Sequence, residues 1–111
     1  MTDLDQTFAA LSDPTRRGVI ELLRRQPRRA SDLADELGAS RPAMSRHLRV
    51  LRQSGLVETT ADEDDDGRER IYRLRPDPFA QLRSWLEQVE MFWTLQLASF
   101  KEHVERTKKK R

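Results

Sequence analysis

Residues 31–55 read SDLADELGASRPAMSRHLRVLRQSG, and this stretch decides the fold. Its apolar residues recur at helical spacing on both sides of Gly38, a residue that breaks helices. Ser31 is expected to cap the first of the two helices and Ser40 the second, because a serine hydroxyl can accept a hydrogen bond from an N–H group of the first turn. Pro42 is tolerated in that turn, where its missing N–H costs nothing. The stretch therefore predicts two short helices joined by a tight turn.

The second of these helices has two different faces. An apolar stripe at spacings of four and three is formed by Met44, Leu48 and Leu51. A separate polar stripe, with no Glu among its members, is formed by Arg41, Ser45, Arg49 and Arg52. One face therefore packs on the protein while the other meets a polar partner, and Gly55 ends the helix. Two helices arranged in this way form a helix-turn-helix, whose second helix fits the major groove of DNA.

Two further helices are expected ahead of this stretch. The apolar face of a short first helix is formed by Leu4, Phe8 and Leu11. Asp13 followed by Pro14 is typical of an N-cap with proline at the first helical position, so a second helix begins there. Pro27 stops that helix.

A different periodicity follows the helix-turn-helix. After Gly55 the apolar residues alternate, which predicts two short strands over residues 57–60 and 71–74, joined by a polar turn at 62–67. A two-stranded hairpin is not stable alone, so it must pack on the helices, in the position of the wing of a winged helix-turn-helix. The predicted fold class is mainly α with a small β-hairpin.

A long helix begins at Asp77. Its main apolar stripe keeps spacings of three and four throughout and consists of Phe79, Leu82, Leu86, Val89, Trp93, Leu97, Phe100 and Val104. A second apolar set, Trp85, Phe92 and Leu95, makes the stripe wider than one small core can cover, which predicts a partner surface. We expect a single domain over residues 1–107, with the helix-turn-helix at 31–54, the wing at 57–75, the long helix at 77–106 and a basic tail at 108–111.

Charge is unevenly distributed along the 111 residues. The net charge is +2, but residues 1–57 carry +3, residues 58–66 carry −6 and residues 67–111 carry +5. The basic excess outside the acidic segment favours a polyanionic partner such as double-stranded DNA. No apolar run is long enough for a signal peptide or a membrane span, which predicts a cytoplasmic protein that does not contact membranes.

Composition limits the possible chemistry. The absence of cysteine excludes disulfides, thiolate metal sites and cysteine nucleophiles. Acidic pairs such as Asp64 and Asp66 lack the apolar surroundings that would raise a carboxyl pKa for acid catalysis. We therefore expect neither an enzyme nor a cofactor. Hydrophobic residues make up only 36% of the chain, and a homodimer would ease this shortage of core.

Three stretches, in order and at matching spacing, resemble the signature of the ArsR-type winged helix-turn-helix repressors. They are ALSDPTRR at residues 10–17, SRHLRVLRQSGLV at 45–57 and GRERIYRL at 67–74, within a likeness that covers about residues 7–75. The resemblance implies a homodimeric transcriptional repressor. Its fourth helix would enter the major groove, and its first and last helices would form the dimer.

The resemblance also implies which residues meet DNA. The groove-facing start of the recognition helix matches Ser40, Arg41, Pro42, Ser45 and Arg46, and the wing matches Arg68 and Arg70. Arg41 and Arg46 are expected to read bases, while Arg49 and Arg52 anchor phosphates. His47 lies at the border of the apolar stripe and is expected either to pack on the protein or to contact DNA. Dimer contacts are expected from Leu4, Phe8, Leu82, Trp85, Leu86, Val89, Phe92, Trp93, Leu97 and Phe100.

The sequence departs from the family pattern in two respects. Members that sense metals use cysteines on the third helix, or paired His and acidic residues on the last helix. Here residues 29–38 contain neither Cys nor His, and the last helix offers only His103, so no metal site is predicted. The acidic wing tip, residues 62–66, would place carboxylates beside phosphates, so it either points away from DNA or disfavours non-specific binding.

Two other functions stay open. A winged helix used for protein interaction would dock a partner helix on the aromatic stripe, and a metal-responsive repressor would use an atypical site. The aromatic residues Trp85, Phe92 and Trp93 fit a ligand pocket less well than an interface, because large side chains at helical spacing are typical of packed surfaces. The sequence identifies no small-molecule effector.

Overall fold

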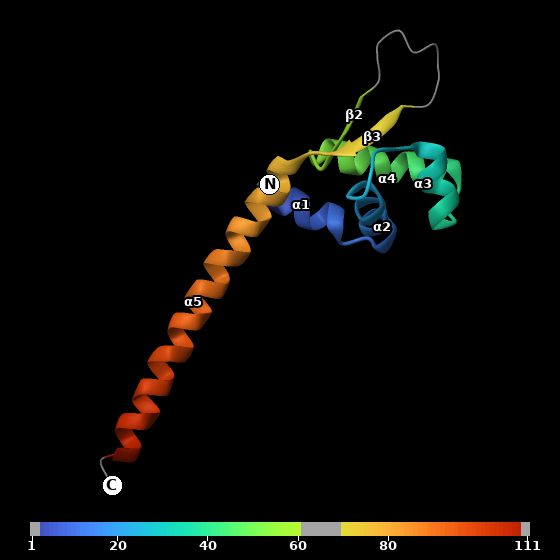
Figure 1. Ribbon diagram of the computed structural model, residues 1–111. Helices are drawn as coiled ribbons and strands as arrows, with labels where there is room; N and C mark the ends of the chain where they lie inside the picture. Colours follow the sequence, from blue (N-terminus) through green and yellow to red (C-terminus); the bar gives the residue numbers. More distant parts are fainter. Residues whose placement is uncertain (1–2, 61–69, 110–111) are drawn as a thin grey trace. The chain divides into compact units, whose positions relative to one another are not determined.

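Five helices and three short strands form the part of the chain that the structure describes. The structure is a computed structural model that describes residues 3–60 and 70–109. In chain order the elements are α1 (Asp3–Leu11), α2 (Pro14–Leu23), β1 (Arg28–Arg29), α3 (Ala30–Leu37), α4 (Arg41–Gln53), β2 (Val57–Thr59), β3 (Ile71–Leu74) and α5 (Pro76–Lys109) (Figure 1). The chain forms two compact units that divide between Ala80 and Gln81. The first unit holds the helix-turn-helix and the strands.

The turn between α3 and α4 depends on glycine, as predicted. Gly38 has φ 63° and ψ 30°, the left-handed conformation in which a side chain is strained. The backbone N–H of Ala39 donates to the carbonyl of Ala34 at 3.0 Å, which satisfies a carbonyl at the end of α3. The C-cap of α4 is Ser54, and the left-handed residue Gly55 follows it with φ 75°. A left-handed glycine therefore follows both helices of the helix-turn-helix.

The prediction that Ser31 caps α3 is wrong. The N-cap lies two residues earlier, at Arg29, whose side chain makes no capping hydrogen bond, and the helix begins at Ala30. Arg29 belongs to β1 and pairs with Ile71 of β3. Because strand pairing brings the extended backbone directly into the helix, Ser31 lies inside the first turn.

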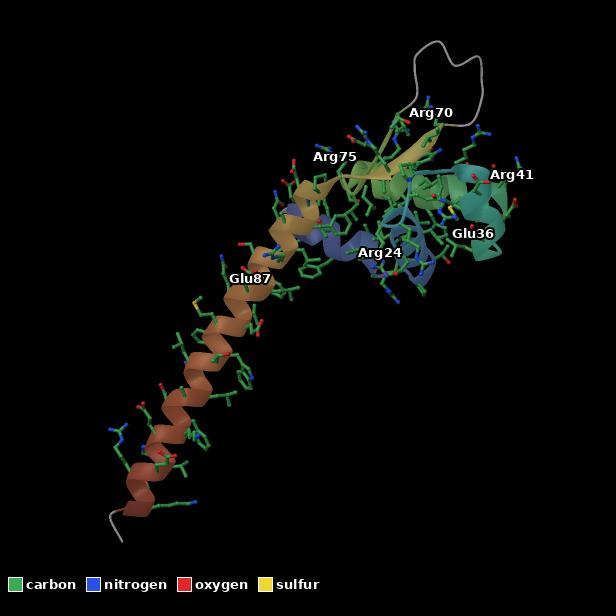
Figure 2. The ribbon with its side chains drawn as sticks, in the orientation of Figure 1. Arg24, Glu36, Arg41, Arg70, Arg75 and Glu87 are labelled. Carbon is green, nitrogen blue, oxygen red and sulfur yellow. The ribbon has the colours of Figure 1, made fainter. Side chains whose placement is uncertain are left out.

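The predicted two-stranded hairpin is also incomplete, because the sheet has three strands in the order β1-β3-β2. The central strand places Tyr72 opposite both Arg28 of β1 and Thr59 of β2. Arg28 also reaches α3, where its Nη1 lies 2.6 Å from Oε1 of Glu36 (Figure 2). A strand of two residues is too short to show alternation, so the sequence pattern does not reveal β1.

The hydrophobic core lies between the helices and the sheet of the first unit. It consists of Ala10, Val19, Leu23, Leu33, Ala34, Met44, Leu48, Leu51, Leu56 and Val57. The apolar stripe predicted for α4 is thus buried. In α1 the buried residues are Thr7 and Ala10 rather than the larger apolar residues of the predicted stripe. The Thr7 hydroxyl donates to the carbonyl of Asp3 at 3.1 Å, so its burial leaves no unpaired donor.

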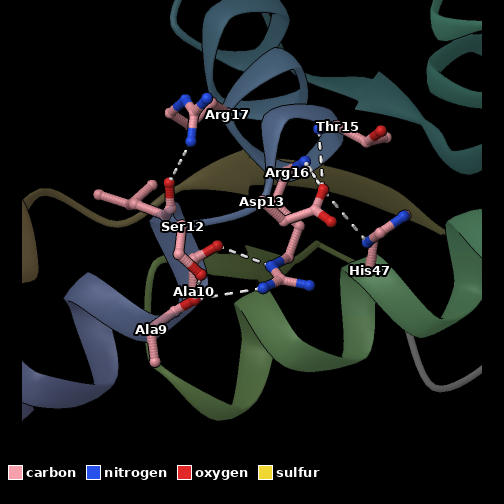
Figure 3. A network of polar contacts seen from close by, with 9 residues as sticks. Ala9, Ala10, Ser12, Asp13, Thr15, Arg16, Arg17 and His47 are labelled. Atoms are coloured by element: carbon pink, nitrogen blue, oxygen red, sulfur yellow. Dashed lines mark hydrogen bonds and ion pairs between the residues drawn. The ribbon is translucent and has the colours of Figure 1, made fainter.

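Polar contacts hold the corner between α1 and α2 (Figure 3). The Asp13 carboxylate accepts hydrogen bonds from the backbone N–H groups of Thr15 at 2.8 Å and Arg16 at 3.1 Å, which confirms the predicted N-cap of α2. The Arg16 side chain in turn donates from Nε to the carbonyl of Ala10 at 2.6 Å. Arg16 therefore satisfies a carbonyl at the end of α1 that would otherwise lack a helical partner.

Candidate nucleic-acid interface

The outer face of α4 is exposed and polar. Its residues are Ser40, Arg41, Pro42, Ser45, Arg46, Arg49 and Arg52, all of which are exposed. Ser40 caps the helix as predicted, since its Oγ accepts a hydrogen bond from the backbone N–H of Ala43 at 3.2 Å. The opposite face is buried in the core. Packing of that face therefore holds the arginine face outward on a rigid helix.

Three arginines of this face have no acidic partner. Within residues 3–60 and 70–109, no carboxylate forms an ion pair with Arg46, Arg49 or Arg52. By contrast, Nε of Arg24, the C-cap residue of α2, lies 2.9 Å from Oε2 of Glu21. The positive charge of these three arginines is thus not paired with any described carboxylate and can meet a ligand that carries negative charge.

A groove runs beside this face, between α4 and β3. It has a volume of about 520 Å³ and is lined by Ser45, Arg49, Arg52, Gln53 and Tyr72. Among the described residues that line it, none is acidic. Of these residues, Ser45, Arg49 and Arg52 are predicted from the sequence as contacts with DNA, whereas Gln53 and Tyr72 are not. Gln53 could have been found from its position four residues after Arg49, whereas Tyr72 joins the site only through the tertiary fold.

The positive charge of the wing strands is partly neutralised by a carboxylate that lies on one of these strands. Glu58 of β2 lies opposite Arg73 of β3. Oε1 of Glu58 lies 2.7 Å from Nε of Arg73, and Oε2 of Glu58 lies 3.7 Å from Nε of Arg75. Arg70 is exposed just before β3 (Figure 2). The predicted contact residue Arg68 and the acidic segment 62–66 lie outside the described residues.

His47 faces the start of α2. Its side chain is half-buried, and its Nδ1 lies 3.9 Å from Oδ1 of Asp13 (Figure 3). The pKa of the Asp13 carboxyl is held below its ordinary value of 3.8, chiefly by the hydrogen bond from the backbone N–H of Arg16. The hydrogen bond from Thr15 and the charges of His47 and Arg16 lower this pKa further, while desolvation opposes them. This geometry favours packing on the protein for His47, and its contact with DNA stays a prediction.

The second unit, which contains most of α5, carries a large exposed apolar surface. The exposed large hydrophobic residues of this helix are Trp85, Leu86, Val89, Met91, Phe92, Trp93, Leu95, Leu97 and Phe100. The exposed fraction is 61% for Trp93 and 66% for Phe100. Among the other residues predicted for the dimer, Leu4 and Leu82 are half-buried and Phe8 is exposed. Ten consecutive residues, 91–100, carry no charge, which the sequence analysis did not note.

The described residues form no cluster of metal ligands and no membrane-spanning helix. In the described part of the chain, no three His, Cys, Asp or Glu side chains gather closely enough to hold a metal ion. His103 lies on an exposed turn of α5. No helix among the described residues is long and apolar enough to cross a membrane.

Residues 13–59 match the family model described as "Bacterial regulatory protein, arsR family". This match contains α2, the helix-turn-helix and β2. The chain is 38% identical over 96 residues to the HTH-type transcriptional regulator Rv2034 of Mycobacterium tuberculosis, an alignment that covers 86% of this chain and 83% of the relative. It is 37% identical over 54 residues to the transcriptional repressor SdpR of Bacillus subtilis, which covers 49% of this chain and 60% of that relative.

A solved structure is similar over nearly the same length. The ArsR-like transcriptional regulator from Rhodococcus sp. RHA1 is 37% identical and superposes with a TM-score of 0.74. The superposition covers 90% of this chain and 91% of the Rhodococcus chain. The similarity therefore extends beyond the helix-turn-helix to most of the chain.

Proposed function

The chain belongs to the ArsR family of bacterial regulatory proteins, and we propose that it regulates transcription by binding specific sites on double-stranded DNA as a homodimer. The observation that carries the proposal is the outer face of α4, where Arg46, Arg49 and Arg52 are exposed on a helix that contains no acidic residue. A helix with such a face fits the major groove, and its arginines can meet both base edges and phosphates.

The start of α4 supplies the sequence-reading groups. Arg41 and Arg46 can each donate two hydrogen bonds to O6 and N7 of a guanine, a pattern that only this base presents in the major groove. Ser40 and Ser45 supply short polar groups nearby. Arg49 and Arg52, nearer the end of the helix, contact phosphates and so set the orientation of α4 on the duplex.

The exposed surface of α5 supports the homodimer. Large aromatic residues such as Phe92, Trp93 and Phe100 are costly to leave in water, and a second copy of the same helix would cover them. A twofold dimer presents two copies of α4, so the operator is pseudo-palindromic with half-sites about 34–36 Å apart.

The name of a relative supports repression over activation of transcription. SdpR is named a transcriptional repressor, and a dimer bound across a promoter would exclude the polymerase. We therefore propose repression by occlusion, in the cytoplasm where the chromosome lies.

Fluorescence anisotropy on an operator selected from random DNA tests the proposal. We expect Arg46→Ala to lose about 1–3 kcal/mol of binding free energy, because two hydrogen bonds to a base are removed. The affinity of the wild type should fall by several powers of ten per tenfold rise in salt concentration, because several phosphates are neutralised.

Arg24→Ala is the matched control, because it removes an exposed arginine that follows the last residue of α2 and pairs with Glu21. Its affinity should equal that of the wild type. A loss below about 1 kcal/mol for Arg46→Ala would show that Arg46 does not read the operator. A shallow salt dependence with no selected sequence would favour a protein-interaction module instead.

A further inference from the structure

We propose that the groove between α4 and β3 binds the sugar-phosphate backbone of one DNA strand, with the Tyr72 hydroxyl and the Gln53 amide as neutral donors beside Arg49 and Arg52. This inference rests on the proposed function and deepens it, because it assigns a part of the DNA to a particular surface. It also adds two residues to the interface that neither the sequence pattern nor the resemblance indicated.

Within residues 3–60 and 70–109, the side-chain hydrogen-bonding groups that line the groove have no partner in the protein. Among residues 3–60 and 70–109, the five side chains that line it make no hydrogen bond or ion pair with one another or with their neighbours. Two guanidinium groups, a side-chain amide and two hydroxyls can together donate many hydrogen bonds, and none of the five carries negative charge. The complementary ligand is therefore rich in acceptor oxygens and anionic, which describes a phosphodiester.

The length of the groove favours a strand over a single ion. Ser45 and Gln53 mark its extent along α4, and a helix rises about 1.5 Å per residue, so these side chains are spread over roughly 12 Å. A DNA strand carries one phosphate for about every 3.4 Å of helix axis. The groove therefore has room to follow more than one phosphate of the same strand.

Tyr72 is held in place by the sheet. It lies on the central strand β3, opposite Arg28 of β1 and Thr59 of β2, and its ring packs against the hydrophobic core. Tyrosine commonly buries its ring and leaves its hydroxyl at a polar surface, and the groove is the polar surface that Tyr72 lines. The Tyr72 hydroxyl is thus positioned by the wing, while Arg49 and Arg52 are positioned by α4.

A role in backbone binding differs measurably from a role in base reading. A backbone contact carries no sequence information, so its loss weakens binding to all sequences alike. A neutral hydroxyl displaces no counterion from DNA, whereas an arginine on a phosphate does. Removal of the hydroxyl should therefore change the affinity without changing its dependence on salt.

The test compares Tyr72→Phe and Arg52→Ala with the wild type by anisotropy at several salt concentrations, on the selected operator and on unrelated DNA. We expect Tyr72→Phe to weaken both complexes about two- to tenfold with an unchanged salt slope. Arg52→Ala should reduce the magnitude of the slope by about one. Thermal unfolding of Tyr72→Phe should match the wild type, because the ring that packs on the core is retained.

Different failures separate this inference from the proposed function. Wild-type affinity for Tyr72→Phe would overturn the role of its hydroxyl, whatever Arg52→Ala does, while loss of operator binding in Arg46→Ala would leave the proposed function intact. Binding of inorganic phosphate that Tyr72→Phe and Arg52→Ala weaken, with DNA affinity equal to the wild type in both variants, would assign the groove to a free anion and overturn the inference. If both Arg46→Ala and Arg52→Ala bound DNA with wild-type affinity, DNA binding by α4 would be contradicted altogether.

Discussion

Gly38 joins the two helices of the helix-turn-helix in a left-handed backbone conformation that glycine adopts without strain. Its φ of 63° is unfavourable for any residue with a Cβ atom, yet no heavy atom of the described residues lies within 4 Å of where that Cβ would be. The effect of Gly38→Ala is therefore conformational and not steric. We expect the free energy of unfolding to fall by about 1–2 kcal/mol, measured by urea denaturation at constant protein concentration.

Gly38→Asn is the comparison that isolates this cause, because asparagine adopts the left-handed conformation more readily than alanine. It should retain more stability than Gly38→Ala although its side chain is larger. If alanine were tolerated as well as asparagine, the conformation of residue 38 would not limit the stability of the turn.

At the scale of residues, both the local sequence and the pairing of distant strands determine where a helix begins and ends. The signals at Asp13, Ser40, Gly38 and Gly55 were read correctly because a cap or a left-handed glycine involves only the adjacent turn. Ser31 was misread because the start of α3 depends on the pairing of β1 with β3, which are far apart in the sequence. A capping residue is therefore predictable from sequence where no strand leads into the helix.

Among the elements, α2 depends on a charged cap, and this makes its stability depend on pH. Because the hydrogen bond from Arg16 and the other contacts lower the pKa of Asp13 in the folded protein, its contribution to stability is complete above its ordinary pKa of 3.8. The contribution is lost as the pH falls through the lowered pKa. Asp13→Asn keeps an oxygen that can accept the same hydrogen bonds, but it does not titrate.

We therefore expect the melting temperature of Asp13→Asn to decline less than that of the wild type as the pH is lowered from about 5 to about 2. Circular dichroism of both proteins, at one concentration and ionic strength, measures this difference. Parallel declines would mean that other carboxylates account for the whole acid response and that the shifted Asp13 has no part in it.

Periodicity predicted the helices better than it predicted the sheet. In α4 the separation of Met44, Leu48 and Leu51 from the arginine face is a property of a single helix, so the sequence contains it completely. The third strand and the groove at Tyr72 arise when segments distant in the sequence meet, and a two-residue strand leaves no alternation to detect. For this reason the sequence indicated the part of the candidate interface that lies on α4 and not the groove to which β3 contributes Tyr72.

At the scale of the whole molecule, the two units differ in how they bury apolar residues. The first unit has its own core, whereas α5 leaves most of its large apolar residues exposed. On α5 the acidic residues Glu87 and Glu90 and the polar Thr94 fall on one face, and Trp93 belongs to the apolar stripe. The amphipathic pattern thus separates a polar face from the apolar stripe on which we propose that a second copy of the chain packs.

This separation gives a matched pair of substitutions. We expect the wild type to sediment at micromolar concentration with twice the 13.0 kDa mass of one chain. Trp93→Asp places a charge within the apolar stripe, where burial in an interface would leave it unpaired, so this variant should sediment as a monomer. Thr94→Asp adds the same charge on the polar face and should remain a dimer.

DNA binding should follow the oligomeric state, because two linked recognition helices bind the two half-sites with an effective concentration that separate monomers lack. Trp93→Asp should therefore bind the full operator about a hundredfold more weakly or worse, while its affinity for an isolated half-site stays close to that of Thr94→Asp. A monomeric wild type, or a Trp93→Asp protein that remains dimeric, would show that the apolar face of α5 serves another partner. In that event the unchanged fold of the first unit would still present α4, and only the pairing of half-sites would have to be abandoned.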